Sequence, residues 1–172
     1  MESHDITDYR LGETNQVLRL DSVEDNRALI EGLLAQAQRY VYIVSRNLDP
    51  LLYDTPSVAD AISRLVREHS RAHVHILITH PELLVKRGHA LVRLAQQLSS
   101  KIKLMQPSEE RRNFNEALLI VDGVGYIHRD MADRMEGLGS FHDPFHARMA
   151  QETFDALWQR ATPISDLRPM LI

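Results

Sequence analysis

Two short apolar segments constrain the fold of this chain more than any other feature of its sequence. Residues 40–44, Tyr-Val-Tyr-Ile-Val, and residues 74–78, Val-His-Ile-Leu-Ile, are rich in β-branched and aromatic side chains and lack the strict polar alternation of a half-exposed strand. Such runs are typical of strands that are covered on both faces. The residues between the two segments have apolar side chains at the spacing of an amphipathic helix. The sequence therefore predicts a layered α/β domain.

Capping signals mark where the helices begin. Ser22 has an acidic residue three positions later, and Thr55 and Asp143 each stand before a proline. The alternation of strands and helices predicts a largely parallel sheet with helices on both faces, because parallel strands are joined by right-handed crossovers. The expected elements up to this point are strands at 17–20, 40–44, 74–78 and 102–105 and helices at 22–38, at 55–69 and from 81 onward.

The pattern changes in the last third of the chain. Residues 118–124, Leu-Leu-Ile-Val-Asp-Gly-Val, contain two apolar runs around an Asp-Gly pair, which is a hairpin signal because this turn needs positive φ. We expect a C-terminal antiparallel hairpin here, a further strand near 137–141 and a last helix from Asp143. The predicted fold class is therefore α/β, with a mixed, largely parallel sheet.

Length and composition restrict the kind of protein. The chain has 172 residues, of which 44% are hydrophobic and 26% charged, and this indicates one globular domain over 17–172 after a flexible, polar lead-in at 1–16. A net charge of −4 argues against general nucleic-acid binding, and the lack of cysteine excludes disulfides and thiol chemistry. The sequence shows neither an export signal nor a long apolar span, so we expect a cytoplasmic protein that does not cross a membrane.

The order of segments, closed by a helix ending Phe-Asp-Ala-Leu-Trp at 154–158, resembles one repeat of the phospholipase D superfamily. In size the chain is similar to the small bacterial nucleases that carry a single repeat, and the resemblance covers about residues 17–160. Its most specific part is Leu118 to Gly123, which is similar to the segment within and just after the family's His-x-Lys-x4-Asp signature. The resemblance implies a phospholipase-D-like fold.

The same resemblance implies an altered site. With Asp122 at the signature Asp, the signature Lys falls on Ala117 and the signature His on Asn115. In the family the His attacks phosphorus and the Lys holds the phosphoryl oxygens, whereas asparagine has no basic nucleophilic nitrogen and alanine has no charge. Losing such a nucleophile costs on the order of 10⁴–10⁶ in rate. We therefore predict a binding or regulatory module rather than an enzyme. The aspartate at position 122 has a structural explanation, because aspartate before glycine favours a hairpin turn.

An altered phosphodiesterase that uses His128 is the first alternative. If the hairpin has a two-residue Asp-Gly loop, His128 lies opposite Ala117 and Asp130 opposite Asn115, on shared faces of the strands. A one-residue bulge would turn His128 to the other face. Glu136 resembles a carboxylate found downstream in the family and is expected nearby, so that the catalytic candidates are His128, Glu136 and Asp122.

A sensor of a small anionic ligand is the second alternative. His80 lies at the carboxyl end of a predicted strand, where open α/β sheets bind ligands, and Asn115 carries an amide that can donate to an anion. The candidate ligand-binding residues are Asn115, His128, Asp130, Glu136 and His80.

No metal or cofactor is expected. His73 and His75 alternate on one strand, and His142 and His146 stand four apart, but each pair offers two ligands, fewer than a zinc site needs. As to partners, the resemblance implies a symmetric homodimer, since single-repeat members pair two half-sites. It also implies an acetyltransferase as a candidate partner, because degenerate domains of this kind occur beside such enzymes in bacteria; nucleic acid is not expected.

Overall fold

A computed structural model of the chain describes residues 5–164 and residue 167. Within these residues the sheet has eight strands in the spatial order β1-β7-β6-β5-β2-β3-β4-β8. The strands are β1 (Leu18–Leu20), β2 (Tyr40–Ser45), β3 (His73–Ile78), β4 (Ile102–Gln106), β5 (Ala117–Val121), β6 (Gly125–Arg129), β7 (Gly137–Ser140) and β8 (Thr162–Pro163).

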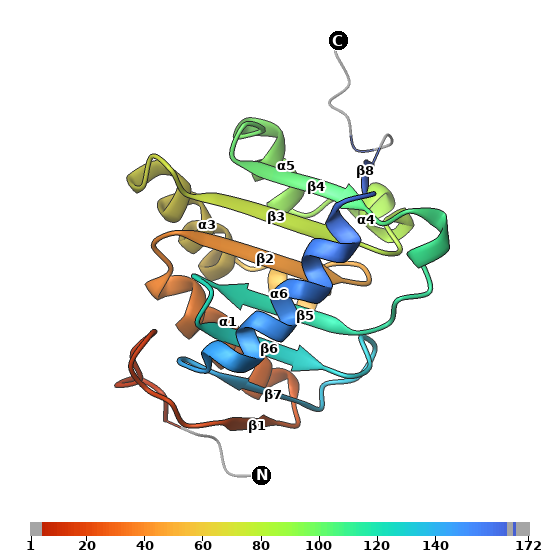
Figure 1. Ribbon diagram of the computed structural model, residues 1–172. Helices are drawn as coiled ribbons and strands as arrows, with labels where there is room; N and C mark the ends of the chain where they lie inside the picture. The colour runs from red at the N-terminus through yellow and green to blue at the C-terminus, as the bar shows by residue number, and fades with distance from the viewer. Residues whose placement is uncertain (1–4, 165–166, 168–172) are drawn as a thin grey trace.

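Helices cover both faces of the sheet, as the sequence predicts (Figure 1). Helix α6, drawn in blue, crosses one face over β5 and β6, and α1 and α3 lie against the other face. The helices are α1 (Val23–Gln36), α2 (Pro50–Tyr53), α3 (Pro56–Glu68), α4 (Glu82–Arg87), α5 (Ala90–Gln97), the 3-10 helix η1 (Glu109–Arg111) and α6 (Pro144–Trp158). No helix in this described part of the chain combines the length and apolar character needed to cross a lipid bilayer.

Strand β5 shows how the two helical layers form separate cores. Its side chains alternate between the faces, so Leu119 belongs to the core beneath α1 and α3, whereas Leu118 and Ile120 pack with Phe154 of α6. Every residue of β5 is buried. A strand covered on both faces needs this continuous apolar sequence.

The prediction of a largely parallel sheet is wrong. Only β2–β3 and β3–β4 are parallel, and the other strand pairs are antiparallel. Strand β1 lies at the sheet edge against β7 instead of joining the parallel strands, and three residues make it short enough for an edge. The predicted hairpin forms, but β5 pairs with β2 in the middle of the sheet because its apolar side chains need cover on both faces.

The hairpin turn has the predicted conformation but not the predicted register. The Asp122-Gly123 pair has φ values of 54° and 73°. The N–H of Val124 donates to the carbonyl of Val121 at 3.1 Å. Val124 then leaves the ladder, because its carbonyl accepts from the N–H of Asp143 at 2.8 Å, and Gly125 pairs with Val121 in its place. The extra residue is a β-bulge.

This bulge at Val124 moves every later residue of β6 by one position. Arg129, and not His128, lies opposite Ala117. His128 lies opposite Leu118, on the sheet face that α6 covers. The prediction that His128 stands beside the signature lysine position is therefore wrong, since one inserted residue exchanges the two faces of a strand.

The helix expected after the second buried strand also differs from the sequence prediction. The helix expected from Pro81 forms as two helices, α4 and α5, because Gly88 with φ 73° interrupts it. The buried His89 then caps α5: its Nδ1 accepts from the N–H of Leu91 at 3.1 Å. Its Nε2 lies 2.9 Å from the carbonyl of Leu48, which fixes the ring between a loop and a helix.

The segment before β1 lies against the domain from residue 5 onward. The ring of Tyr9 meets Phe141 edge-on at 5.8 Å between centroids, and the N–H of Gly12 donates to the carbonyl of Phe141 at 2.9 Å. The N–H of Leu11 donates to Gln36 of α1 at 2.8 Å. The flexibility of residues 1–16 stays a prediction, and residues 1–4 lie outside the described part.

Candidate functional site

A groove of about 180 Å³ lies between the β5–β6 hairpin and helix α6; we call it the hairpin groove. Residues of the hairpin form one wall of the groove, and residues of α6 form the other. Both polar and apolar side chains line it. The lining residues are Glu116, Leu118, Tyr126, His128, His146, Met149, Ala150 and Thr153.

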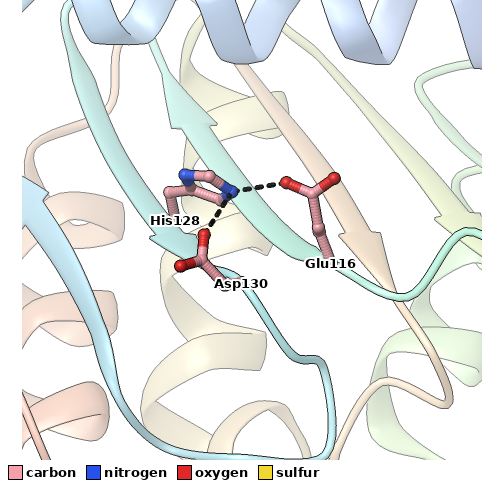
Figure 2. Close-up of side chains that lie close together, drawn as sticks. All are labelled: Glu116, His128 and Asp130. Atoms are coloured by element: carbon pink, nitrogen blue, oxygen red, sulfur yellow. Dashed lines mark hydrogen bonds and ion pairs between the residues drawn. The ribbon is translucent and has the colours of Figure 1, made fainter.

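Three side chains at one end of the hairpin groove point toward one another (Figure 2). His128 Nε2 lies 2.6 Å from Glu116 Oε1 and 3.5 Å from Asp130 Oδ1. The register of β5 and β6, continued by one residue, sets Asp130 opposite Glu116 and not opposite Asn115, so the predicted Asp130–Asn115 pairing is also wrong. The bulge at Val124 thus creates this cluster, because it turns His128 toward Glu116.

The short His128–Glu116 contact orients the imidazole. At 2.6 Å, Nε2–H donates a charge-assisted hydrogen bond to the carboxylate. In the neutral ring the lone pair then belongs to Nδ1. Both side chains are partly exposed, at 38% and 41%, so the pair is accessible to a ligand. A held imidazole of this kind serves as a general base through Nδ1 or, in the other neutral tautomer with its proton on Nδ1, as a metal ligand through Nε2.

A second histidine, His146, lines the hairpin groove from α6. Its Nδ1 lies 2.7 Å from Oδ2 of Asp143, the residue that caps the helix. The ring of Tyr126 stacks on His146 with 5.5 Å between centroids. Burial, with a smaller contribution from Asp143, raises the pKa of Tyr126 to about 12, so this hydroxyl stays protonated at neutral pH and can donate a hydrogen bond.

The residues at the signature positions lie outside the hairpin groove. Asn115 is exposed, and its carbonyl accepts from the N–H of Ala132 at 2.7 Å. Ala117 is 8% exposed and lies opposite Arg129. Arg129 is 3% exposed, and its guanidinium donates to the carbonyl of Ala132 at 3.3 Å and contacts the Met135 sulfur at 3.5 Å. The Arg129 guanidinium is therefore already bound to groups inside the protein.

Asp122 has a structural task in this fold. Its carboxylate accepts hydrogen bonds from the backbone N–H groups of Gln38, Arg39 and Tyr40 at 2.9, 2.8 and 3.0 Å. Asp122 directly follows the last residue of β5, whereas Asn115 lies two positions before the first residue of that strand. Asp122 thus holds the turn that leads into β2, at the other end of the strand from Asn115.

Glu136 and His80 lie apart from the hairpin groove. Glu136 is exposed and lines a separate hollow with Asp130 and Arg134. His80 is also exposed, and its Nδ1 lies 3.1 Å from the Thr79 hydroxyl. Of the residues proposed from the sequence, His128 and Asp130 come into direct contact, and Glu136 shares only the separate hollow with Asp130.

Sequence reasoning missed Glu116 because it paired Asp130 with Asn115. A count that allowed one bulged residue after the Asp-Gly turn would have set Glu116 opposite Asp130. Of the histidines considered as metal pairs, His73 and His75 belong to an aromatic layer under α6: the ring of His75 stacks on Trp158 with 4.3 Å between centroids, and its centroid lies 4.8 Å from that of His73. His146 lines the hairpin groove instead.

Comparison with known proteins identifies the family of the chain. A family model matches residues 22–170, which is most of the sequence. The chain belongs to the family described as a domain of unknown function, DUF7931. A search of curated proteins finds no match to this DUF7931 chain.

Solved structures similar to this DUF7931 chain share its fold. Nuc, a phospholipase D family member from Salmonella typhimurium, is 17% identical with a TM-score of 0.59 over 90% of this chain and 99% of that chain. NucT from Helicobacter pylori is 13% identical with a TM-score of 0.59, over 87% and 98%. TrmBL2, an archaeal chromatin protein with a novel mode of DNA binding, is 17% identical with a TM-score of 0.64; the match covers 87% of this chain and 55% of TrmBL2.

These likenesses confirm the phospholipase-D-like fold expected from the sequence. The chain spans nearly the whole of Nuc and NucT but about half the length of TrmBL2. At these identities the likeness concerns the fold, and function has to be argued from the site.

Proposed function

We propose that this DUF7931 chain is a phospholipase-D-like domain that does not hydrolyse phosphodiesters and acts as a binding or regulatory module. The observation that carries the proposal is the pair Asn115 and Ala117 at the positions of the family's His and Lys. Neither side chain supplies a nucleophile or a positive charge. Arg129, opposite Ala117, is no substitute for the lysine, because its guanidinium is buried and donates to a backbone carbonyl.

The test is a phosphodiesterase assay with bis(p-nitrophenyl) phosphate and single-stranded DNA as substrates. We expect the chain to turn over at least about 10⁴-fold more slowly than an active phospholipase D enzyme measured in parallel, as loss of a covalent nucleophile predicts. Turnover within about 100-fold of the active enzyme, retained through repeated purification, would contradict the proposal.

A weak phosphodiesterase built on His128 is the second candidate, and the 2.6 Å contact with Glu116 favours it because this contact orients the imidazole. The same assay separates the candidates. Activity that disappears in His128→Ala and persists in His80→Gln, a change at an exposed histidine outside the hairpin groove, would replace the first proposal with the second. Equal background rates in the wild type, His128→Ala and His80→Gln would exclude the phosphodiesterase built on His128.

We also propose that two copies form a symmetric homodimer, by analogy with single-repeat phospholipase D proteins. Sedimentation velocity at micromolar concentration is expected to give a species of about twice the chain mass of 19.8 kDa. A single species with the mass of one chain across this concentration range would contradict the dimer.

A further inference from the structure

We propose that Glu116, His128 and Asp130 bind a divalent transition-metal ion, with Zn²⁺ as the reference ion. This inference does not depend on the proposed function. The three residues offer an imidazole nitrogen and two carboxylate oxygens that all lie within 4.8 Å of one another. Imidazole and carboxylate are ligands that Zn²⁺ takes in proteins, and three protein ligands leave a fourth position free.

The strand register explains why the charges at this point need a cation. Glu116 and Asp130 lie opposite each other where the hairpin opens, and like charges in that position destabilise a strand pair. His128, two residues before Asp130 and on the same face of the strand, is the side chain that lies between the two carboxylates. Among the described residues, no lysine or arginine forms an ion pair with either carboxylate. A divalent ion would balance both charges at once.

The geometry is close to what a metal centre requires. A tetrahedral zinc ion with bonds of about 2.0–2.2 Å holds its ligand atoms about 3.3–3.6 Å apart. His128 Nε2 and Asp130 Oδ1 already lie 3.5 Å apart, whereas the 2.6 Å contact between Nε2 and Glu116 Oε1 has to open. The Asp130 side chain is 92% exposed and that of Glu116 41%, so both can rotate without repacking the core.

Metal binding would also use the hairpin groove. The ion would occupy the Nε2 lone pair of the neutral imidazole, whose single proton then sits on Nδ1, so a ring that is neutral before binding releases no proton and an imidazolium ring releases one to solvent. Glu116 and His128 line the groove, which leaves the remaining coordination position directed at water or at a small ligand there. An imidazole ligand favours zinc, cobalt and nickel over magnesium and calcium. Selectivity for Zn²⁺ over Mg²⁺ of at least about 100-fold is therefore expected.

Isothermal titration of the untagged, chelator-treated full chain with Zn²⁺ tests the proposal. We expect one ion per chain, with the affinity reduced at least about tenfold in His128→Gln, Glu116→Gln and Asp130→Asn. Asp130→Asn is the decisive variant, because a side chain that is 92% exposed contributes little to folding. Circular dichroism of each variant confirms that the fold is retained.

The matched control is His146→Gln, which removes the other histidine–carboxylate pair of the hairpin groove, His146–Asp143 at 2.7 Å. This pair offers two ligands, so the variant is expected to keep the Zn²⁺ affinity within about twofold. Absence of stoichiometric binding at micromolar Zn²⁺ would overturn the proposal. Binding that survives both Asp130→Asn and Glu116→Gln but is lost in His146→Gln would also overturn it.

Discussion

Replacing Asp122 with alanine is expected to lower the free energy of unfolding by about 2–4 kcal/mol. The change removes the acceptor for three backbone N–H groups, those of residues 38, 39 and 40, at the start of the central strand β2. It also places a residue that disfavours positive φ at a position with φ 54°. Chemical denaturation near neutral pH measures the difference.

Two variants distinguish the loss of these hydrogen bonds from a general effect of removing a negative charge. Asp122→Asn keeps one carbonyl acceptor and tolerates positive φ, so it should lose less stability than the alanine variant. Asp130→Ala removes an exposed carboxylate and should change stability by no more than about 0.5 kcal/mol. An Asp122→Ala protein as stable as the wild type would show that the three hydrogen bonds contribute nothing. The predicted loss would give the aspartate at this position a structural reason.

Stability is expected to fall by about 1–2 kcal/mol as the pH decreases from about 6.5 to about 4, owing to His75, because solvent screens part of the effect at this half-buried ring. Burial under Trp158 and beside Tyr42, with smaller contributions from His73 and Lys103, lowers the pKa of His75 from 6.5 to about 4. Between these values the unfolded chain binds a proton that the folded chain does not. Acid therefore favours the unfolded state throughout this window.

The His75→Phe variant isolates this contribution. Phenylalanine preserves an aromatic ring beside Trp158 and Tyr42 but cannot take up a proton, so the fall in stability between pH 6.5 and 4 should be smaller by about 1–2 kcal/mol. Urea denaturation at several pH values gives the comparison. His80→Gln, at an exposed histidine, serves as the control and should follow the wild type. Parallel stability–pH curves for His75→Phe and the wild type would refute the assignment.

The sequence predicted those parts of the fold whose signals are local. The apolar runs at 40–44 and 74–78 form β2 and β3, and both are covered by helices as expected. The caps at Ser22 and Asp143 begin α1 and α6, where each side chain accepts a backbone hydrogen bond. The positive φ of the Asp-Gly turn was predictable for the same reason, because the preference belongs to these residues themselves.

The candidate site depended on a contact between distant segments. Val124 leaves the ladder because its carbonyl accepts from the N–H of Asp143, nineteen positions later in the chain. That single hydrogen bond, together with the glycine at 125 where Leu33 and Leu11 approach, moves His128 from one face of the sheet to the other. No pattern within the hairpin specifies it.

The amino-acid sequence by itself therefore determined most of the elements, their apolar faces and, through the resemblance, the phospholipase-D-like fold. Tertiary structure decided the mainly antiparallel pairing, the edge position of β1 and the meeting of Glu116, His128 and Asp130. The physical reason is one of range. Periodicity, capping and turn preference act over a few residues, whereas strand order and register are set by burial and hydrogen bonds between segments that are far apart in the chain.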